Sequence, residues 1–127
     1  MTTIRVQDGD SVTYTNAGSA ISAGDPVVMG AAGIVTVGIA LTDIAATTGV
    51  GEVAITGVFD MLATTGAAFT AGESVDYDDS TGLVDDNAMT PAAGDVSDFG
   101  IAMETIATAG AGSRVKVKLT PGNGAIT

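Results

Sequence analysis

A glycine followed by an acidic residue recurs five times along the chain, at Gly9-Asp10, Gly24-Asp25, Gly51-Glu52, Gly72-Glu73 and Gly94-Asp95. Glycine tolerates the positive φ that a tight turn needs, and the acid can bond a turn amide or stay solvated. Four of the steps precede β-prone runs, at residues 11–15, 27–29, 53–59 and 75–77, and the fifth is interpreted as part of a loop. Short strands joined by tight turns are typical of an all-β chain.

Composition supports the same fold class. Hydrophobic residues make up 46% of the chain but aromatic residues only 4%, and most of the apolar side chains are Ala, Val and Ile. Small and β-branched side chains suit pleated sheets better than a helical bundle. A length of 127 residues is enough for one domain. The sequence therefore predicts a compact single-domain β-barrel-like or sandwich fold.

Two segments of the chain are echoed further on. Residues 22–27 (SAGDPV) resemble residues 70–75 (TAGESV), 48 positions later, and residues 38–45 (GIALTDIA) resemble residues 100–107 (GIAMETIA), 62 positions later. We therefore expect two pseudo-repeated β units at about 19–57 and 67–119, the second with an insertion near 85–99. The predicted organisation is an N-terminal arm at 1–8, a β domain at 9–120 and a flexible C-terminal tail at 121–127.

Basic residues are concentrated near the end of the chain. The segment Arg114–Leu119 alternates charged and apolar residues, which predicts a half-buried strand with Arg114, Lys116 and Lys118 on its solvent side. These side chains either contact an acidic partner or form an ordinary solvated face. We also expect one arm, either Met1–Gln7 or Gly122–Thr127, to reach a neighbouring subunit. The N-terminal arm is favoured, because Ile4 and Val6 alternate with Arg5 and could add a strand to an exposed edge.

Several function classes are disfavoured. A net charge of −11 repels nucleic acid and anionic membranes. The absence of His and Cys removes Ser-His-Asp and Cys-His catalysis, the common zinc sites and disulfides. Carboxylate pairs remain, but the aromatic platforms typical of glycosidases are missing. No secretory signal and no apolar stretch long enough for a bilayer is present. We expect no enzyme activity and no cofactor.

The loop Asp76–Asp79 and the residues that follow it invite comparison with a calcium site. Carboxylate and hydroxyl oxygens at alternate positions suit Ca²⁺. However, the glycine, Gly82, falls one position late, and Asn87 stands where a bidentate Glu is needed. A solvated hairpin turn is the favoured interpretation, with ion binding left open.

A series of short motifs, taken in their order along the chain, resembles the series found in the phage capsid cement family. They are Gln7-Asp8-Gly9-Asp10-Ser11-Val12, Ala17-Gly18, Ala23-Gly24-Asp25-Pro26-Val27-Val28, Gly38-Ile39-Ala40, Thr56-Gly57-Val58-Phe59-Asp60-Met61, a second Gly-Ile-Ala at Gly100, and the alternating strand at Arg114–Leu119. The resemblance covers nearly the whole chain. It departs at Leu62-Ala63-Thr64, where many members have Pro and Lys, and in the length of residues 85–99.

This resemblance implies a structural protein made in the host cytoplasm and located on the outer surface of the phage head. Such proteins bind the major capsid protein, often as homotrimers at local three-fold axes, and stabilise the expanded shell by bridging neighbouring subunits. The expected contact residues are Ile4, Arg5, Val6, Arg114, Lys116 and Lys118, facing the capsid or a neighbour. The alternative is a calcium-dependent fibre, surface-layer or adhesin-like β module.

Overall fold

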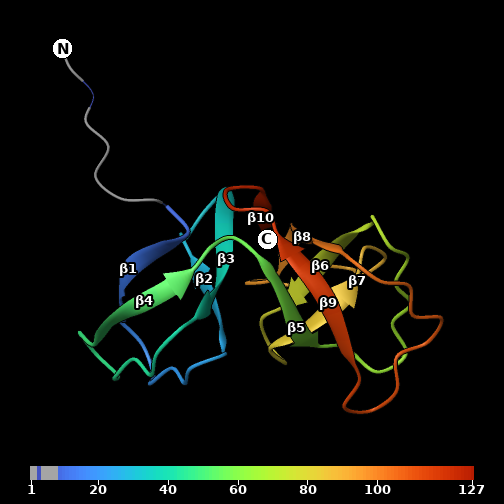
Figure 1. Ribbon diagram of the computed structural model, residues 1–127, viewed down its shortest axis with the longest axis horizontal. Coiled ribbons are helices and arrows are strands. Elements are labelled where there is room, and N and C mark those ends of the chain that lie inside the picture. Colours follow the sequence, from blue (N-terminus) through green and yellow to red (C-terminus); the bar gives the residue numbers. More distant parts are fainter. Residues whose placement is uncertain (1–2, 4–8) are drawn as a thin grey trace.

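The computed structural model describes residue 3 and residues 9–127. Across these residues the chain forms ten β-strands and no helix, which confirms the predicted all-β class (Figure 1). The strands are β1 (Ser11–Thr15), β2 (Pro26–Met29), β3 (Ile34–Ala40), β4 (Val50–Ala54), β5 (Val58–Leu62), β6 (Ser74–Asp78), β7 (Leu83–Asp86), β8 (Val96–Ala102), β9 (Arg114–Leu119) and β10 (Gly124–Ile126).

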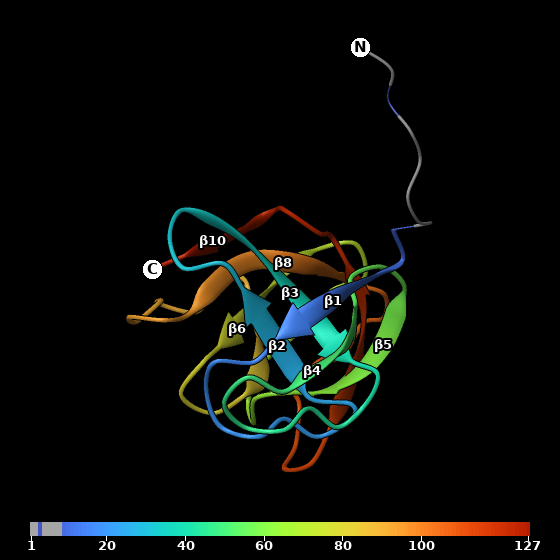
Figure 2. The same cartoon turned by 90° about the vertical axis from the view of Figure 1, so that its left-hand side faces the viewer.

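The strands form one curled antiparallel sheet. Its main path runs β1-β4-β3-β10-β8-β6-β7, with β2 paired to β3, and with β9 paired to both β8 and β5. Figure 1 shows β1 to β4 in one half of the molecule and β5 to β9 in the other, with β10 between β3 and β8. Figure 2 shows the first half end-on. The short strand β10 therefore joins two groups of strands.

The two groups are related units with the same strand pairing. The order is β1-β4-β3-β2 in the first unit and β5-β9-β8-β6 in the second, where β7 extends the edge. Val27 pairs with Gly38 in the first unit, and Val75 pairs with Gly100 in the second. Val75 lies 48 positions after Val27, and Gly100 lies 62 positions after Gly38, which are the offsets between the similar segments of the sequence. The predicted fold with two related β units is confirmed.

The turns that introduce β2 and β6 show why glycine precedes the acid. The Gly24 N–H donates to Ala40 O (2.7 Å), and the Ala40 N–H donates to Asp25 O (2.9 Å), so two residues of one strand oppose one residue of the other. This β-bulge needs a positive φ at its first position, and Gly24 has φ +92°. The same bulge recurs at Gly72 (φ +93°) and at Gly94 (φ +92°).

The acid that follows the glycine closes the turn. The Asp25 carboxylate accepts the Ser22 N–H at 3.0 Å, and the Asp95 carboxylate accepts the Ala92 N–H at 2.7 Å. The interpretation of Gly94-Asp95 as a simple loop was therefore wrong, because this step leads directly into β8. The segment between β6 and β8, residues 79–95, is longer than the segment between β2 and β3, residues 30–33, and contains β7. It overlaps the insertion expected near 85–99.

Two further expectations differ from the structure. The run 53–59 is not one strand, since β4 ends at Ala54, Gly57 takes φ +112°, and β5 begins at Val58. Gly51-Glu52 consequently lies inside β4. Residues 121–127 are not simply a flexible tail, because they contain β10, which pairs with β3 and β8. The expected arm at 1–8 lies outside the described residues apart from residue 3.

The buried residues form two clusters. The larger one is built from β3 and from the strands of the second unit, and includes Tyr77 and Phe99, whose rings meet edge-on with centroids 6.1 Å apart. The smaller one lies inside the first unit and contains Val27, Ala40, Ile44 and Val53. Val35, Val37 and Ile39 of β3 belong to the larger cluster and Ala40 to the smaller one, so this strand packs on both faces.

Candidate interaction surface

The last long strand, β9, carries three of the four basic residues of the protein on one face. Val115, Val117 and Leu119 point into the larger core and are 0, 0 and 3% exposed. The side chains between them, Arg114, Lys116 and Lys118, are exposed. The predicted alternation is thus observed, and the structure brings these three cations onto one surface.

The neighbouring strand β5 completes this surface. Val58 lies opposite Lys118, Asp60 opposite Lys116 and Leu62 opposite Arg114. Val58 is 52% exposed and Leu62 is 42% exposed, so apolar area lies beside the charges. Arginine is enriched in protein–protein contacts, whereas lysine is depleted from their buried centre and suits a polar rim. We call this surface the basic face and define it by Val58, Asp60, Leu62, Arg114, Lys116 and Lys118.

One carboxylate and one backbone carbonyl contact two of the cations of the basic face. The Lys116 Nζ lies 3.7 Å from Glu104 Oε2, and the Lys116 N–H donates to Glu104 Oε1 at 3.0 Å. The Arg114 Nη1 donates to the backbone O of Asp60 at 3.2 Å. Exposed ion pairs of this kind contribute about 0–1 kcal/mol. They position the side chains while leaving them accessible to a partner.

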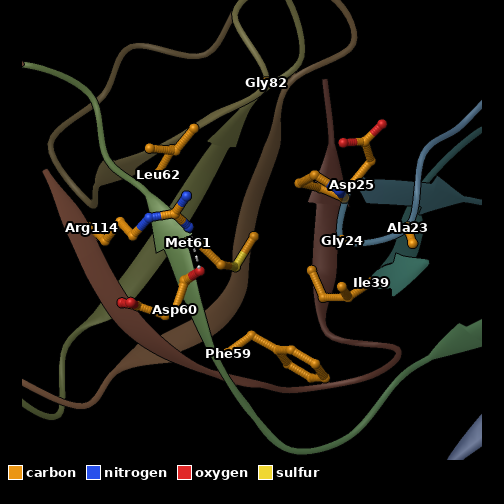
Figure 3. Close-up of a pocket in the computed structure, with 11 residues that line it drawn as sticks. Ala23, Gly24, Asp25, Ile39, Phe59, Asp60, Met61, Leu62, Gly82 and Arg114 are labelled. Atoms are coloured by element: carbon orange, nitrogen blue, oxygen red, sulfur yellow. Dashed lines mark hydrogen bonds between the residues drawn. The ribbon is translucent and has the colours of Figure 1, made fainter. Parts of the chain in front are cut away.

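A groove of about 440 Å³ adjoins the basic face and separates β5 from the start of β2. Phe59 and Met61 of β5 extend into it on one side, and Ile39 lies on the other (Figure 3). Asp25 and Arg114 also line it. Polar and apolar groups contribute about equally to the lining of this groove. Sequence reasoning missed this groove because its two walls come from different units.

The turn of the hairpin between β6 and β7 is held by the carboxylate of Asp78, the last residue of β6. Asp78 Oδ1 accepts hydrogen bonds from Ser80 N (2.9 Å), Ser80 Oγ (2.6 Å) and Thr81 N (3.3 Å). The Ser80 hydroxyl is the largest of several causes that hold the pKa of Asp78 below its usual value. Within residues 9–127 no group of three or more Asp or Glu side chains could hold a metal ion. These contacts support the hairpin interpretation of the acidic loop.

A second carboxylate of this hairpin is buried. Asp76 is only 4% exposed, and its Oδ1 accepts the Asp98 N–H at 3.0 Å. Burial raises the pKa of Asp76, and the nearby carboxylates of Asp98, Asp85 and Asp86 raise it further. Burial also raises the pKa of Asp85. The environment of Asp76 and Asp85 therefore favours their protonated form, in contrast to that of Asp78.

The other predicted contact residues, Ile4, Arg5 and Val6, lie outside the described residues. Their contact role remains a proposal.

The fold and its surfaces define a class: an all-β module built from two related units, whose prominent features are an exposed charged face and a groove. A family model for phage cement proteins matches residues 6–119 of the 127. The chain belongs to the phage cement protein family and has a structural role in the phage capsid. No curated protein and no solved structure matches it. Across the described part of the chain, no helix has the length and apolarity to span a bilayer.

Proposed function

We propose that this protein binds the outer surface of the phage head and stabilises the expanded shell by bridging neighbouring major capsid subunits, without a catalytic role. The family match over residues 6–119 is the observation that carries this proposal. The position of the basic face supports it, because an exposed surface with apolar and cationic side chains is available for contact with another protein.

Two sets of residues are proposed to make the contacts. Ile4, Arg5 and Val6 alternate apolar and basic side chains, which suits an added strand on a sheet edge of the capsid. Arg114, Lys116 and Lys118 of the basic face meet the capsid or a neighbouring copy. The assembled form is proposed to be a homotrimer at local three-fold positions, so that each copy can touch more than one capsid subunit.

Co-sedimentation with expanded, undecorated heads of the phage tests this function. The purified protein is titrated against heads, and cryo-EM of the pellet locates it. Saturable binding with density at three-fold positions on the outer surface is the expected result. Failure of a protein with a β-sheet circular dichroism spectrum to pellet with the heads would overturn the proposal.

A variant lacking residues 2–6 tests the contribution of the N-terminal residues. We expect it to keep the melting temperature of the full chain and to bind heads at least about tenfold more weakly, because the strand contact is lost. Undiminished binding would remove Ile4, Arg5 and Val6 from the contact. Running the same titration with calcium and with EDTA separates capsid binding from the calcium-dependent fibre or adhesin role.

A further inference from the structure

The two units place residues of opposite charge at the same position. Leu41 N–H donates to Glu52 O at 2.9 Å in the first unit, and Met103 N–H donates to Lys116 O at 2.8 Å in the second. Across the next pair of strands, Thr13 is the partner of Glu52 and Asp60 is the partner of Lys116. Glu52 and Lys116 are therefore structural equivalents, and so are the surfaces around them.

The equivalent surface of the first unit has its own composition. We call it the acidic face and define it by Ser11, Thr13, Leu41, Val50 and Glu52. Both hydroxyls bond the carboxylate, Ser11 Oγ to Glu52 Oε2 at 3.1 Å and Thr13 Oγ1 to Glu52 Oε1 at 2.6 Å. Val50 is 61% exposed and Leu41 is 51% exposed. This face thus combines a fixed negative charge with exposed apolar area.

The charge distribution of the whole chain decides what the basic face attracts. The net charge is −11, with only four basic residues, and three of those lie on the basic face. A second copy is therefore repelled by most of the surface but attracted at this face. The acidic face offers it a carboxylate for Lys116, and apolar Leu41 and Val50 for Val58 and Leu62.

We propose that the basic face of one copy binds the acidic face of a second copy. The two faces lie on different halves of the molecule, β1 and β4 on one and β5 and β9 on the other (Figure 1). Each copy can therefore offer one face to each of two neighbours, and such head-to-tail contacts form a ring when the rotation between copies closes. The contact deepens the proposed function, since it assigns the basic face to the neighbouring copy and leaves the capsid to other surfaces.

A charge swap tests the contact without capsids. Sedimentation velocity at low salt measures self-association of the full chain and of the variants Lys116→Glu, Glu52→Lys and the double variant carrying both. We expect each single change to weaken association at least about tenfold and the double variant to recover most of the loss. A wild-type chain that stays monomeric, or single variants that associate normally, would overturn the proposal.

Glu52→Lys also removes the two hydroxyl contacts, so loss of folding has to be distinguished from loss of binding. Glu73→Lys is the matched control, because it changes the net charge equally at an exposed turn outside both faces. It should associate at least as well as the wild type. Recovery of self-association in the double variant cannot come from unfolding. If a folded double variant does not recover self-association, the proposed Glu52–Lys116 pairing is wrong.

Cross-linking gives a second readout, because the chain has no cysteine. Thr13→Cys and Val58→Cys are prepared separately, mixed, and treated with a short bismaleimide. We expect cross-linked dimers in the mixture and few in either variant alone, since the two faces differ. Strong self-cross-linking of Val58→Cys alone would show that like faces meet and would overturn the proposal. Head binding is measured separately, so a failed self-contact does not imply failed capsid binding.

Discussion

Gly100 lies so close to Val117 that a Cβ added to the glycine would come within 2.6 Å of the valine Cγ1. The same relationship holds in the first unit, where a Cβ on Gly38 would come within 2.5 Å of Val53 Cγ1. The glycine of each Gly-Ile-Ala motif thus serves close packing between neighbouring strands. Neither residue has a positive φ, so steric room is the reason for glycine here.

Gly100→Ala should lower the free energy of unfolding by about 1–3 kcal/mol, because the new methyl group overpacks β8 against β9. Chemical denaturation monitored by circular dichroism measures this. Gly18→Ala is the control, since its nearest neighbour to an added Cβ is Asn16 Oδ1 at 3.8 Å. Equal stability of the two variants would contradict the close approach.

The pH dependence of stability should contain a contribution from Asp76. Because burial raises the pKa of this carboxyl, the folded state holds the proton more tightly than the unfolded state. Its contribution to the free energy of unfolding therefore falls as pH rises from about 4 through the raised pKa, and stays low above it.

Asp76→Asn keeps an oxygen acceptor for the Asp98 N–H but cannot ionise. The variant should gain stability relative to the wild type as pH rises from about 3 to 7. Urea unfolding at several pH values measures this difference, and Glu73→Gln at an exposed turn is the comparison. A difference that is independent of pH would contradict the assignment.

The hairpin carboxylate Asp78 should stabilise the fold without a metal. Asp78→Ala removes the acceptor for Ser80 and Thr81 and should cost about 1 kcal/mol, whereas Asp78→Asn should cost less because it keeps an oxygen. Thermal melts with calcium and with EDTA should coincide for the wild type. A calcium-dependent rise in melting temperature would contradict this prediction and would support ion binding at this loop.

Residues 124–127 should be required for full stability. Ile126 packs against the larger core, and its N–H donates to Gly33 O at 3.0 Å. Ile126→Ala should cost about 2 kcal/mol by loss of partly buried apolar area. Deletion of 124–127 should cost more, because β3 and β8 both lose a paired strand. Unchanged melting of the truncated chain would show that β10 contributes little.

Periodic and turn-forming segments were predictable from the sequence. The alternation in Arg114–Leu119 gave both the strand and its exposed side, and the Ala-Gly-acid pattern marked the turns before β2 and β6. These features depend on neighbours within a few residues. The offsets of 48 and 62 positions further indicated two related units, which the strand pairing shows.

Long-range features were not predictable in the same way. The strand β10 has only three residues, Gly124–Ile126, too few for a periodic signal, and its pairing depends on β3 and β8. Nothing in the sequence indicated that Glu52 belongs to an interaction surface. Its equivalence to Lys116 appears only when the strand registers of the two units are compared. The groove likewise depends on Ile39 and Met61, which are distant in sequence and line its opposite sides.

The position of β10 also sets an order of events during synthesis. Both strands that it joins, β3 and β8, leave the ribosome before it does. The first unit can close its own pairing while the second is still being made, since segments that emerge first tend to fold first. The hydrogen-bonded connection from β3 to β8 can form only after β10 has emerged. In nascent chains that end before Gly124, the edges of β3 and β8 that pair with β10 should therefore be unpaired. Exposed strand edges of this kind promote aggregation.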